Sequence, residues 1–272
     1  MAKFEGQVVL ITGASSGIGA ALARAFANEG AHTILMARRA ERIEELAREL
    51  TDGKRRSIAV TGDVTHDGDL ERAVDRARTE FGRLDIAVAN AGFSVAGRLL
   101  DITLDDYRRQ FETNVFGVLR TLFAAIPELR KTKGRIVLLG SLAGAISLPG
   151  GTAYSMSKFA LAGLADGLSH ELAADGVSVT HIMAGFVNTE IYQIDNQGVP
   201  KQDPNARWPP TRITLSPDRA ARQILSAAYR RKRLQVVTGH AKASILSQRL
   251  FPGIVYFAIS RAVRKIGYAR QN

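Results

Sequence analysis

The alternation of short apolar runs with longer helical segments constrains the fold of this chain most strongly. Six apolar runs read as buried strands, with a short seventh run near the end: 8–12, 33–37, 57–61, 84–89, 135–139, 177–183 and 234–238. Helical patterns separate them: 17–29, 40–50, 67–81, 104–130, 154–174 and 217–231. Strands that alternate with helices of this length form a parallel sheet covered on both faces. The sequence therefore predicts an α/β protein with a doubly wound parallel sheet.

The charge distribution divides the chain into two parts. The net charge of the 272 residues is +11, but residues 1–218 hold 25 basic and 26 acidic side chains. Residues 219–272 hold 12 basic and no acidic side chains. No Pro/Gly/Ser-rich linker separates the chain into two halves. We expect a single domain at 1–240, followed by a basic amphipathic C-terminal extension at 241–272.

The residue types that are missing exclude several kinds of chemistry. The chain has no cysteine, which excludes disulfides and thiolate catalysis and is compatible with a reducing compartment. Its five histidines show no metal-ligand spacing, so no metal site is expected. Neither a signal peptide nor an apolar run long enough to span a membrane is visible. These features predict a cytoplasmic protein.

A glycine-rich loop follows the first predicted strand. It reads Thr12-Gly-Ala-Ser-Ser-Gly-Ile-Gly19 and leads directly into the first helix. Small residues let the backbone approach a pyrophosphate, and a helix N-terminus offers free N–H groups with a partial positive charge. The loop favours dinucleotide binding, although its spacing is G-x-x-x-G-x-G and not the common G-x-G-x-x-G.

A tyrosine and a lysine lie one helical turn apart further along the chain. Tyr154 and Lys158 share one helix face, and Ser141 follows the strand at 135–139. An ammonium near a phenol lowers the pKa of the phenol, and a value of roughly 7 corresponds to about 4 kcal/mol of stabilisation of the phenolate. Such a tyrosine can exchange protons at neutral pH, and Ser141 can hold a carbonyl beside it.

These motifs, with Asn90-Ala-Gly92 and Asn114 between them, resemble the short-chain dehydrogenase/reductase family in order and spacing. The resemblance covers roughly residues 5–240. It implies a Rossmann fold, a nicotinamide cofactor and no metal. It also implies a homodimer or homotetramer formed through the long helices.

The resemblance assigns most of the expected cofactor contacts. Contacts to the pyrophosphate are expected from the glycine-rich loop: Gly13, Ser15, Ser16, Gly17, Ile18 and Gly19. Contacts to the adenine side and along the cofactor are expected from two further segments: Asp63, Val64, Asn90, Ala91 and Gly92. Val187 and Thr189 are expected at the carboxamide, and Tyr154 and Lys158 also contact the cofactor.

The end of the second strand bears on the choice between NAD and NADP. An acid there would bind the ribose 2′-hydroxyl, but this chain has Arg38 and Arg39. Guanidinium groups can bind a 2′-phosphate through two hydrogen bonds. The sequence therefore predicts NADP(H).

The resemblance also implies the catalytic roles. Tyr154 would transfer the proton to the carbonyl oxygen, and Lys158 would bind the nicotinamide ribose and lower the tyrosine pKa. Ser141 would orient the carbonyl, and Asn114 would hold a water that relays protons to Lys158. One departure concerns the family's Pro-Gly turn after the sixth strand, because Ala184 replaces the proline and makes the turn less rigid.

Two regions bear on the substrate. The segment 190–215 occupies the family's substrate-loop position and is expected to be a lid or, alternatively, an ordered surface loop. The basic tail alternates arginines with apolar residues around Pro252-Gly253, which is typical of segments that bind anionic membrane surfaces. The alternative is a helix that packs on its own domain or on a second subunit. No nucleic-acid recognition motif accompanies the basic residues.

Taken together, the sequence predicts an NADPH-dependent oxidoreductase that reduces a ketone or aldehyde, or catalyses the reverse reaction. A membrane-facing tail would suit a lipophilic substrate, such as a long-chain 3-keto lipid, a sphingoid precursor, a steroid or a retinoid. The alternative is a sensor or scaffold that binds NADP without turnover. The filled catalytic positions argue against that alternative.

Overall fold

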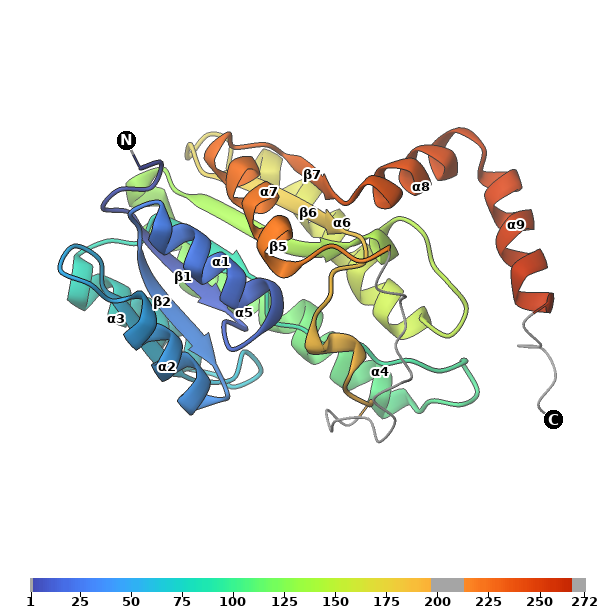
Figure 1. Ribbon diagram of the computed structural model, residues 1–272, viewed down its shortest axis with the longest axis horizontal. Coiled ribbons are helices and arrows are strands. Elements are labelled where there is room, and N and C mark those ends of the chain that lie inside the picture. The colour runs from blue at the N-terminus through green and yellow to red at the C-terminus, as the bar shows by residue number, and fades with distance from the viewer. Residues whose placement is uncertain (1, 197–212, 266–272) are drawn as a thin grey trace.

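A computed structural model describes residues 2–196 and 213–265 and shows a seven-stranded sheet (Figure 1). The strands are β1 (Val8–Thr12), β2 (His32–Ala37), β3 (Ser57–Thr61), β4 (Ile86–Ala89), β5 (Arg135–Ser141), β6 (Ser178–Ala184) and β7 (Leu234–Val237). Their order is β3-β2-β1-β4-β5-β6-β7, and each neighbouring pair is parallel. The predicted doubly wound Rossmann fold is confirmed.

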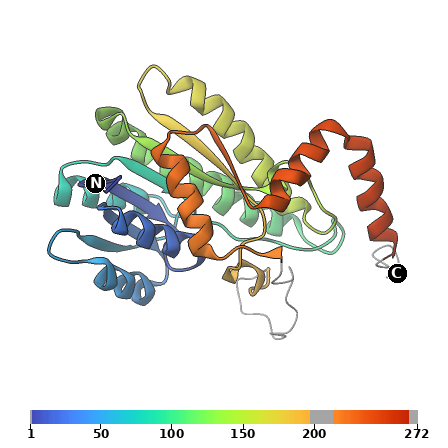
Figure 2. The same ribbon diagram turned by 45° about the horizontal axis from the view of Figure 1, so that its top comes forward.

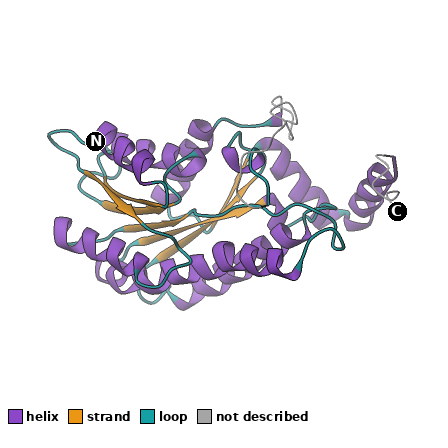
Figure 3. Cartoon of the chain, turned by 90° about the horizontal axis from the view of Figure 1, so that it is seen from below, coloured by secondary structure: helices purple, strands orange, loops and turns teal. Residues whose placement is uncertain are grey.

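Helices cover both faces of this sheet (Figure 3). The α-helices that build the layers are α1 (Gly17–Asn28), α2 (Ala40–Leu50), α3 (Asp69–Phe81), α4 (Leu104–Phe111), α5 (Gly117–Thr132), α6 (Thr152–Glu171) and α7 (Pro217–Tyr229). The short turns are η1 (Glu112–Phe116), η2 (Leu142–Gly144) and η3 (Glu190–Tyr192). Helices α8 (Gly239–Leu250) and α9 (Pro252–Lys265) complete the described chain.

Two hydrophobic cores form because the central strands are apolar on both sides. All five residues of β1 are buried, and alternate residues enter opposite cores. One core joins Val9 and Ile11 to α1 and α7, and the other joins Val8 and Leu10 to α3, α5 and α6. Burial on both faces holds the strand register, and with it the positions of the strand ends.

The parallel register brings the predicted site residues to one edge of the sheet. Ser141 at the end of β5 pairs with Ala184 at the end of β6, and Thr12 ends β1. The sheet order reverses between β1 and β4, which is where open α/β sheets bind ligands. The carboxyl ends of β1, β4, β5 and β6 therefore surround a single region.

The prediction of one continuous helix at 104–130 was wrong. The structure has two α-helices, α4 and α5, joined by the π-helical turn η1. Asn114 lies in this turn, and its side chain is completely buried. A π turn widens the backbone ring, which lets one side chain turn inward without ending the helix. The remaining elements match the predicted ranges to within three residues at each end.

The last two helices leave the body of the domain (Figure 2). Helix α8 begins at Gly239, and the chain changes direction at Phe251 before α9 begins at Pro252. The apolar stretch predicted in the tail is therefore two helices broken at the Pro-Gly pair. Within residues 2–196 and 213–265, every helix is too short or too polar to cross a membrane.

Candidate active site

The glycine-rich loop forms a tight bend between β1 and α1. Gly13 and Gly17 have φ angles of +66° and +55°, which favour glycine. A Cβ on Gly19 would come within 2.3 Å of the Gly13 carbonyl oxygen, so the helix packs directly on the loop. The first turn of α1 carries no acidic residue, and the Ser16 side chain makes no capping hydrogen bond to it. The backbone N–H groups at the start of α1 are therefore suited to bind a pyrophosphate.

The end of β4 is fastened to this loop. The Asn90 side-chain amide donates to the carbonyl oxygens of Thr12 (2.9 Å) and Gly13 (3.2 Å). The Thr12 hydroxyl accepts the backbone N–H groups of Asn90 and Ala91. A Cβ on Gly13 would meet the Ala91 Cα at 2.8 Å, so only glycine allows this approach. Asn90 and Ala91 thus support the loop, and their contacts to the cofactor stay a prediction.

An arginine cluster lies beside the loop. Arg39 Nη2 donates to the hydroxyls of Ser15 (2.9 Å) and Ser16 (2.8 Å), and its Nη1 lies 2.8 Å from Glu190 Oε2. Arg42 Nη1 lies 2.6 Å from Glu190 Oε1. Two guanidinium groups therefore converge on one carboxylate at the edge of the phosphate loop. These arginines keep the pKa of Glu190 below its ordinary value although burial opposes them.

Arg38 has a different environment from Arg39. Its side chain is 79% exposed, and its Nη1 lies 3.6 Å from Asp63 Oδ2. Asp63 Oδ1 accepts both the N–H and the hydroxyl of Thr65, which holds the carboxylate in a turn. Val64 is buried and would meet a Cβ on Gly117 at 2.6 Å, so the turn packs on the start of α5. The Asp63–Val64 pair thus borders the sheet edge next to Arg38.

The predicted serine, tyrosine and lysine come together at the ends of β5 and α6. The Tyr154 phenol interacts with the Ser141 hydroxyl, which also accepts the Ala143 N–H at 3.1 Å. Lys158 is buried, and its Nζ lies 5.5 Å from the centre of the Tyr154 ring. It donates to the Leu139 carbonyl oxygen at 2.8 Å. The Ser141 hydroxyl and the Lys158 ammonium thus both lie close to Tyr154.

The pKa of Tyr154 differs from the sequence-based expectation. Burial raises the pKa of this phenol, and the interaction with Ser141 only partly offsets that rise. Burial also lowers the pKa of Lys158 to about 8. The expected lowering of the Tyr154 pKa to near neutrality is therefore not seen in the chain as described, because desolvation outweighs the influences that favour the phenolate. Tyr154 is therefore a neutral phenol at neutral pH.

The Asn114 side chain acts as a tie within the protein. Its amide nitrogen donates to the Phe93 carbonyl oxygen (3.0 Å) and to the Ser157 hydroxyl (3.2 Å), and its oxygen accepts the Phe93 N–H (3.1 Å). Gly92 allows this contact, since a Cβ there would lie 3.0 Å from Asn114 Oδ1. The residue joins η1 to α6 near Lys158. A water relay at Asn114 remains a prediction.

The segment after β6 closes the site from the other side. Val187 is buried and bridges to Leu215, and Thr189 Cγ2 lies 3.0 Å from the position of a Cβ on Gly17. Thr189 therefore packs against the phosphate loop, while Val187 pairs with the residue two before α7. Residues 197–212, which include most of the predicted lid with Trp208, lie outside the described residues.

Sequence reasoning missed three residues at this site. Arg42 and Glu190 complete the arginine cluster, and Tyr192 interacts electrostatically with Tyr154. Arg42 lies three residues after Arg39 on α2, a spacing that places both on one side of the helix. Glu190 and Tyr192 lie in the segment 190–215 predicted as the substrate loop, but the sequence gives no signal for their particular contacts.

The fold and this site define the chain as a dinucleotide-binding enzyme. The residues present fit a nicotinamide dinucleotide. Three features lie at the same edge of the sheet: the uncapped N-terminus of α1, the close glycine contacts and the arginine cluster. Residues 7–199 match the family model described as short chain dehydrogenase. The chain belongs to the short-chain dehydrogenase family and is an oxidoreductase that uses NAD(P).

Individual relatives agree with this assignment. The chain is 34% identical over 274 residues to "Uncharacterized oxidoreductase YxnA" of Bacillus subtilis, covering 99% of this chain and 75% of the relative. A short-chain dehydrogenase of Burkholderia cenocepacia in complex with NADP is 31% identical, with a TM-score of 0.77 over 88% of this chain and 99% of that one. One from Burkholderia phymatum in complex with NAD is 25% identical, with a TM-score of 0.80 over 92% and 95%.

Proposed function

We propose that this protein is an NADPH-dependent reductase of ketones or aldehydes that takes the proton from Tyr154. The observation that carries the proposal is the contact between Tyr154 and Ser141, with Lys158 directly beneath the tyrosine ring. A nicotinamide cofactor would exchange a hydride with the carbonyl carbon. The Ser141 hydroxyl would hold the carbonyl oxygen, and the Tyr154 phenol would donate a proton to that oxygen.

The protonation states favour the direction of reduction. A phenol with a raised pKa is protonated at neutral pH, and it can donate its proton as negative charge develops on the carbonyl oxygen. Lys158 carries a positive charge below a pH of about 8, and this charge stabilises the phenolate that the transfer leaves behind. The buried His181 stays neutral because burial and Lys158 lower its pKa to about 4.

The arginine cluster supports the choice of NADPH. Glu190 shows that an anion fits between Arg39 and Arg42, next to the hydroxyls of Ser15 and Ser16. A ribose 2′-phosphate carries the same sign of charge and could take the place of this carboxylate. Arg38 is exposed and has only a long ion pair to Asp63, so it can turn toward the same phosphate.

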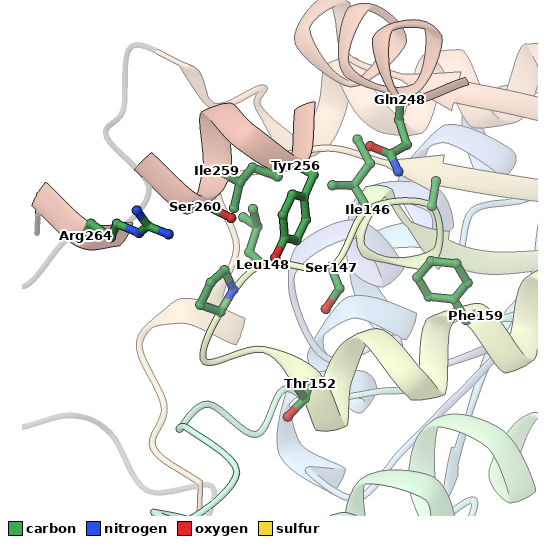
Figure 4. Close-up of a pocket in the computed structure, with 12 residues that line it drawn as sticks. Ile146, Ser147, Leu148, Thr152, Phe159, Gln248, Tyr256, Ile259, Ser260 and Arg264 are labelled. Carbon is green, nitrogen blue, oxygen red and sulfur yellow. The ribbon is translucent and has the colours of Figure 1, made fainter. Parts of the chain in front are cut away.

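An apolar cavity near the catalytic helix supports a lipophilic substrate. The cavity has a volume of about 530 Å³ and lies between α9, the loop after β5 and the start of α6 (Figure 4). Tyr256 of α9 projects toward Leu148 in this loop, and Thr152 lies two residues before Tyr154. Its lining is mostly apolar: Ala145, Ile146, Leu148, Pro149, Phe159, Tyr256 and Ile259. Such a cavity suits a hydrocarbon chain or a fused ring system.

The last two helices support association with an anionic membrane surface. Several large apolar side chains are exposed there: Leu246, Leu250, Phe251, Ile254, Tyr256 and Phe257. Basic residues alternate with them, and the segment from residue 219 onward contains no acid. Apolar side chains next to arginines bind the interface of anionic bilayers. The same exposed side chains would also suit the alternative, in which α8 and α9 pack against a second subunit.

A second exposed apolar surface supports a homodimer or homotetramer. Phe116, Phe123, Met156 and Phe159 are each about half exposed or more, and they lie on η1, α5 and α6. Unpaired apolar surface of this kind usually marks a protein contact.

A panel of carbonyl compounds tests the proposed function. It should include medium- and long-chain 3-keto esters, steroid ketones, retinal and simple diketones, with oxidation of NADPH and of NADH followed separately. We expect turnover with NADPH and higher activity with the apolar members. A protein that binds NADPH but reduces no carbonyl, and oxidises none of the matching alcohols with NADP, would instead be a sensor or scaffold.

Liposomes test the membrane proposal. Ile254→Asp with Phe257→Asp should reduce flotation with anionic vesicles, while Leu99→Asp, which changes an exposed leucine on the main body, should not. Equal flotation of all three proteins would contradict membrane binding through α9. Size-exclusion chromatography of the same variants would then reveal whether α9 contacts a second subunit.

A further inference from the structure

The junction between β7 and α8 is strained. Thr238 has φ of 89°, which is rare for a β-branched residue because its Cβ crowds the backbone. Thr238 is nevertheless buried, and its hydroxyl accepts the Ala241 N–H to cap α8. Such strain persists where the surrounding structure requires it, often near a functional site. The junction therefore has a defined shape, and it places the next residues of α8 against the turn that follows β6.

His240 contacts that turn in two ways. Its Nε2 accepts the backbone N–H of Phe186 at 3.1 Å, and its ring stacks on the Phe186 ring with centres 5.3 Å apart and planes 26° apart. The same Nε2 lies 3.2 Å from the Thr238 hydroxyl. Space for this contact exists because a Cβ on Gly185 would lie 2.5 Å from His240 Nε2. The turn that lacks the family's proline is thus held by a side chain of α8.

Phe186 also packs against a second aromatic residue of the segment after β6. Its ring packs edge-on against Tyr192 of η3, with centres 6.4 Å apart. The turn itself begins beside the catalytic serine, since the Ser141 hydroxyl donates to the Ala184 carbonyl oxygen at 3.4 Å. His240, Phe186 and Tyr192 therefore form an aromatic row from α8 to η3, next to the end of β6, and the charges of Tyr192 and Tyr154 influence each other. We call this row the aromatic wall.

We propose that the aromatic wall lines the substrate side of Tyr154 and that His240 is its positioning residue. This inference rests on the proposed carbonyl reduction and names the part of a substrate that the site selects. The wall would contact a flat apolar group next to the reacting carbonyl. His240 would hold the wall in position, because it binds the Phe186 backbone N–H and stacks on the Phe186 ring. Substrate selectivity would thereby depend on the first turn of α8.

Two diketones with the same reacting group test the inference. In 1-phenyl-1,2-propanedione a phenyl ring replaces one methyl of 2,3-butanedione, so only the first offers a ring to the wall. His240→Phe keeps the ring and removes the acceptor, whereas His240→Gln keeps an acceptor and removes the ring. Lys242→Gln, an exposed position two residues further along α8, is the control. NADPH affinity and the melting temperature are measured for every variant.

We expect His240→Phe to raise KM for the phenyl diketone about tenfold, with KM for butanedione and NADPH affinity within about twofold. His240→Gln should retain part of the selectivity, because it can still accept the Phe186 N–H. The inference is wrong if the ratio of the two KM values stays at the wild-type value in His240→Phe. Should that variant not fold, Phe186→Leu decides in the same assay, since it removes the ring and keeps the backbone bond.

The outcomes also separate this inference from the proposed function. If the wild-type protein reduces neither diketone nor any other carbonyl of the panel, the proposed reaction fails. If the wild type reduces both and the variants keep its selectivity, only the role of the wall fails. Loss of both substrates in equal measure would point to a general structural role and would also overturn the inference.

Discussion

Arg39 and Glu190 are 151 positions apart in the chain, yet Nη1 of the arginine lies 2.8 Å from Oε2 of the glutamate. The pair joins the end of β2 to the segment after β6, directly above the phosphate loop. Arg42 binds the other carboxylate oxygen, so Glu190 forms ion pairs with both arginines. Any anionic group of a cofactor at this position must compete with the protein's own carboxylate.

Removing that carboxylate should tighten the binding of NADPH. In Glu190→Gln the arginines keep a neutral partner, so a 2′-phosphate meets less competition and less repulsion. We expect the NADPH dissociation constant to fall about three- to tenfold and the NADH constant to stay within about twofold. Fluorescence titration measures both constants.

Arg39→Gln should have the opposite effect and weaken the binding of NADPH much more than the binding of NADH. Arg48→Gln, an exposed change near the other end of α2, serves as the control. Equal losses for the two cofactors in Arg39→Gln would contradict the proposed phosphate site.

Replacing the buried lysine should stabilise the fold while it destroys activity. Burial lowers the pKa of Lys158 from its ordinary 10.5 to about 8, so the folded state binds this proton less well than the unfolded state does. Lys158→Met removes a desolvation cost on the order of 3 kcal/mol and loses the hydrogen bond to Leu139. We expect a net gain of about 1–3 kcal/mol in the free energy of unfolding at neutral pH.

The sign of that gain can be checked with pH. Between about pH 8 and 10.5 the folded wild type has already lost the proton that the unfolded chain still holds, so wild-type stability rises relative to Lys158→Met. The advantage of the variant should therefore shrink as the pH rises through this range. Urea unfolding at several pH values measures the difference, and an advantage that grows with pH would contradict the assignment.

The rate of carbonyl reduction should fall at alkaline pH. Tyr154 remains protonated through the neutral range because burial raises its pKa, whereas Lys158 loses its charge above about 8. We expect kcat/KM for reduction to be level between about pH 6 and 7.5 and to decrease above about pH 8. A rate that increases steadily from pH 7 to 9 would indicate that the phenolate is the reactive form.

Asn114→Ala should weaken the domain. The change leaves the part-buried Phe93 N–H without its acceptor and the Ser157 hydroxyl without a donor, whereas the Phe93 carbonyl oxygen keeps the bond from Gln110. Each such loss costs about 1–3 kcal/mol, so we expect the free energy of unfolding to drop by about 2 kcal/mol or more. Chemical denaturation with an unchanged slope would measure this loss, and full stability would show that the π turn does not need the side chain.

The sequence was sufficient for the sheet and for the residues that carry its chemistry. Buried strands and helices have distinct periodicities, and Ser141, Tyr154 and Lys158 lie at positions that the parallel topology brings together. The π turn at Asn114 escaped prediction because apolar residues continue through it with nearly helical spacing. Its signal is a single polar residue, which is equally common on helix surfaces.

Contacts between distant segments were beyond sequence reasoning. Glu190 and His240 lie in segments that carry no motif, and their partners Arg39 and Phe186 are 151 and 54 positions away. The pKa of Tyr154 was misjudged for a related reason. The spacing of Tyr154 and Lys158 reveals their proximity, whereas the desolvation that raises the phenol pKa depends on everything packed around them.

Substitution of the proton donor tests the central claim most directly. Tyr154→Phe removes only the phenolic hydroxyl, and NADPH oxidation is followed with 1-phenyl-1,2-propanedione while NADPH affinity is measured by fluorescence. We expect kcat to fall by about 10²- to 10⁴-fold with NADPH affinity within about twofold of the wild type. A variant that binds NADPH normally and keeps a turnover close to that of the wild type would contradict proton donation by Tyr154.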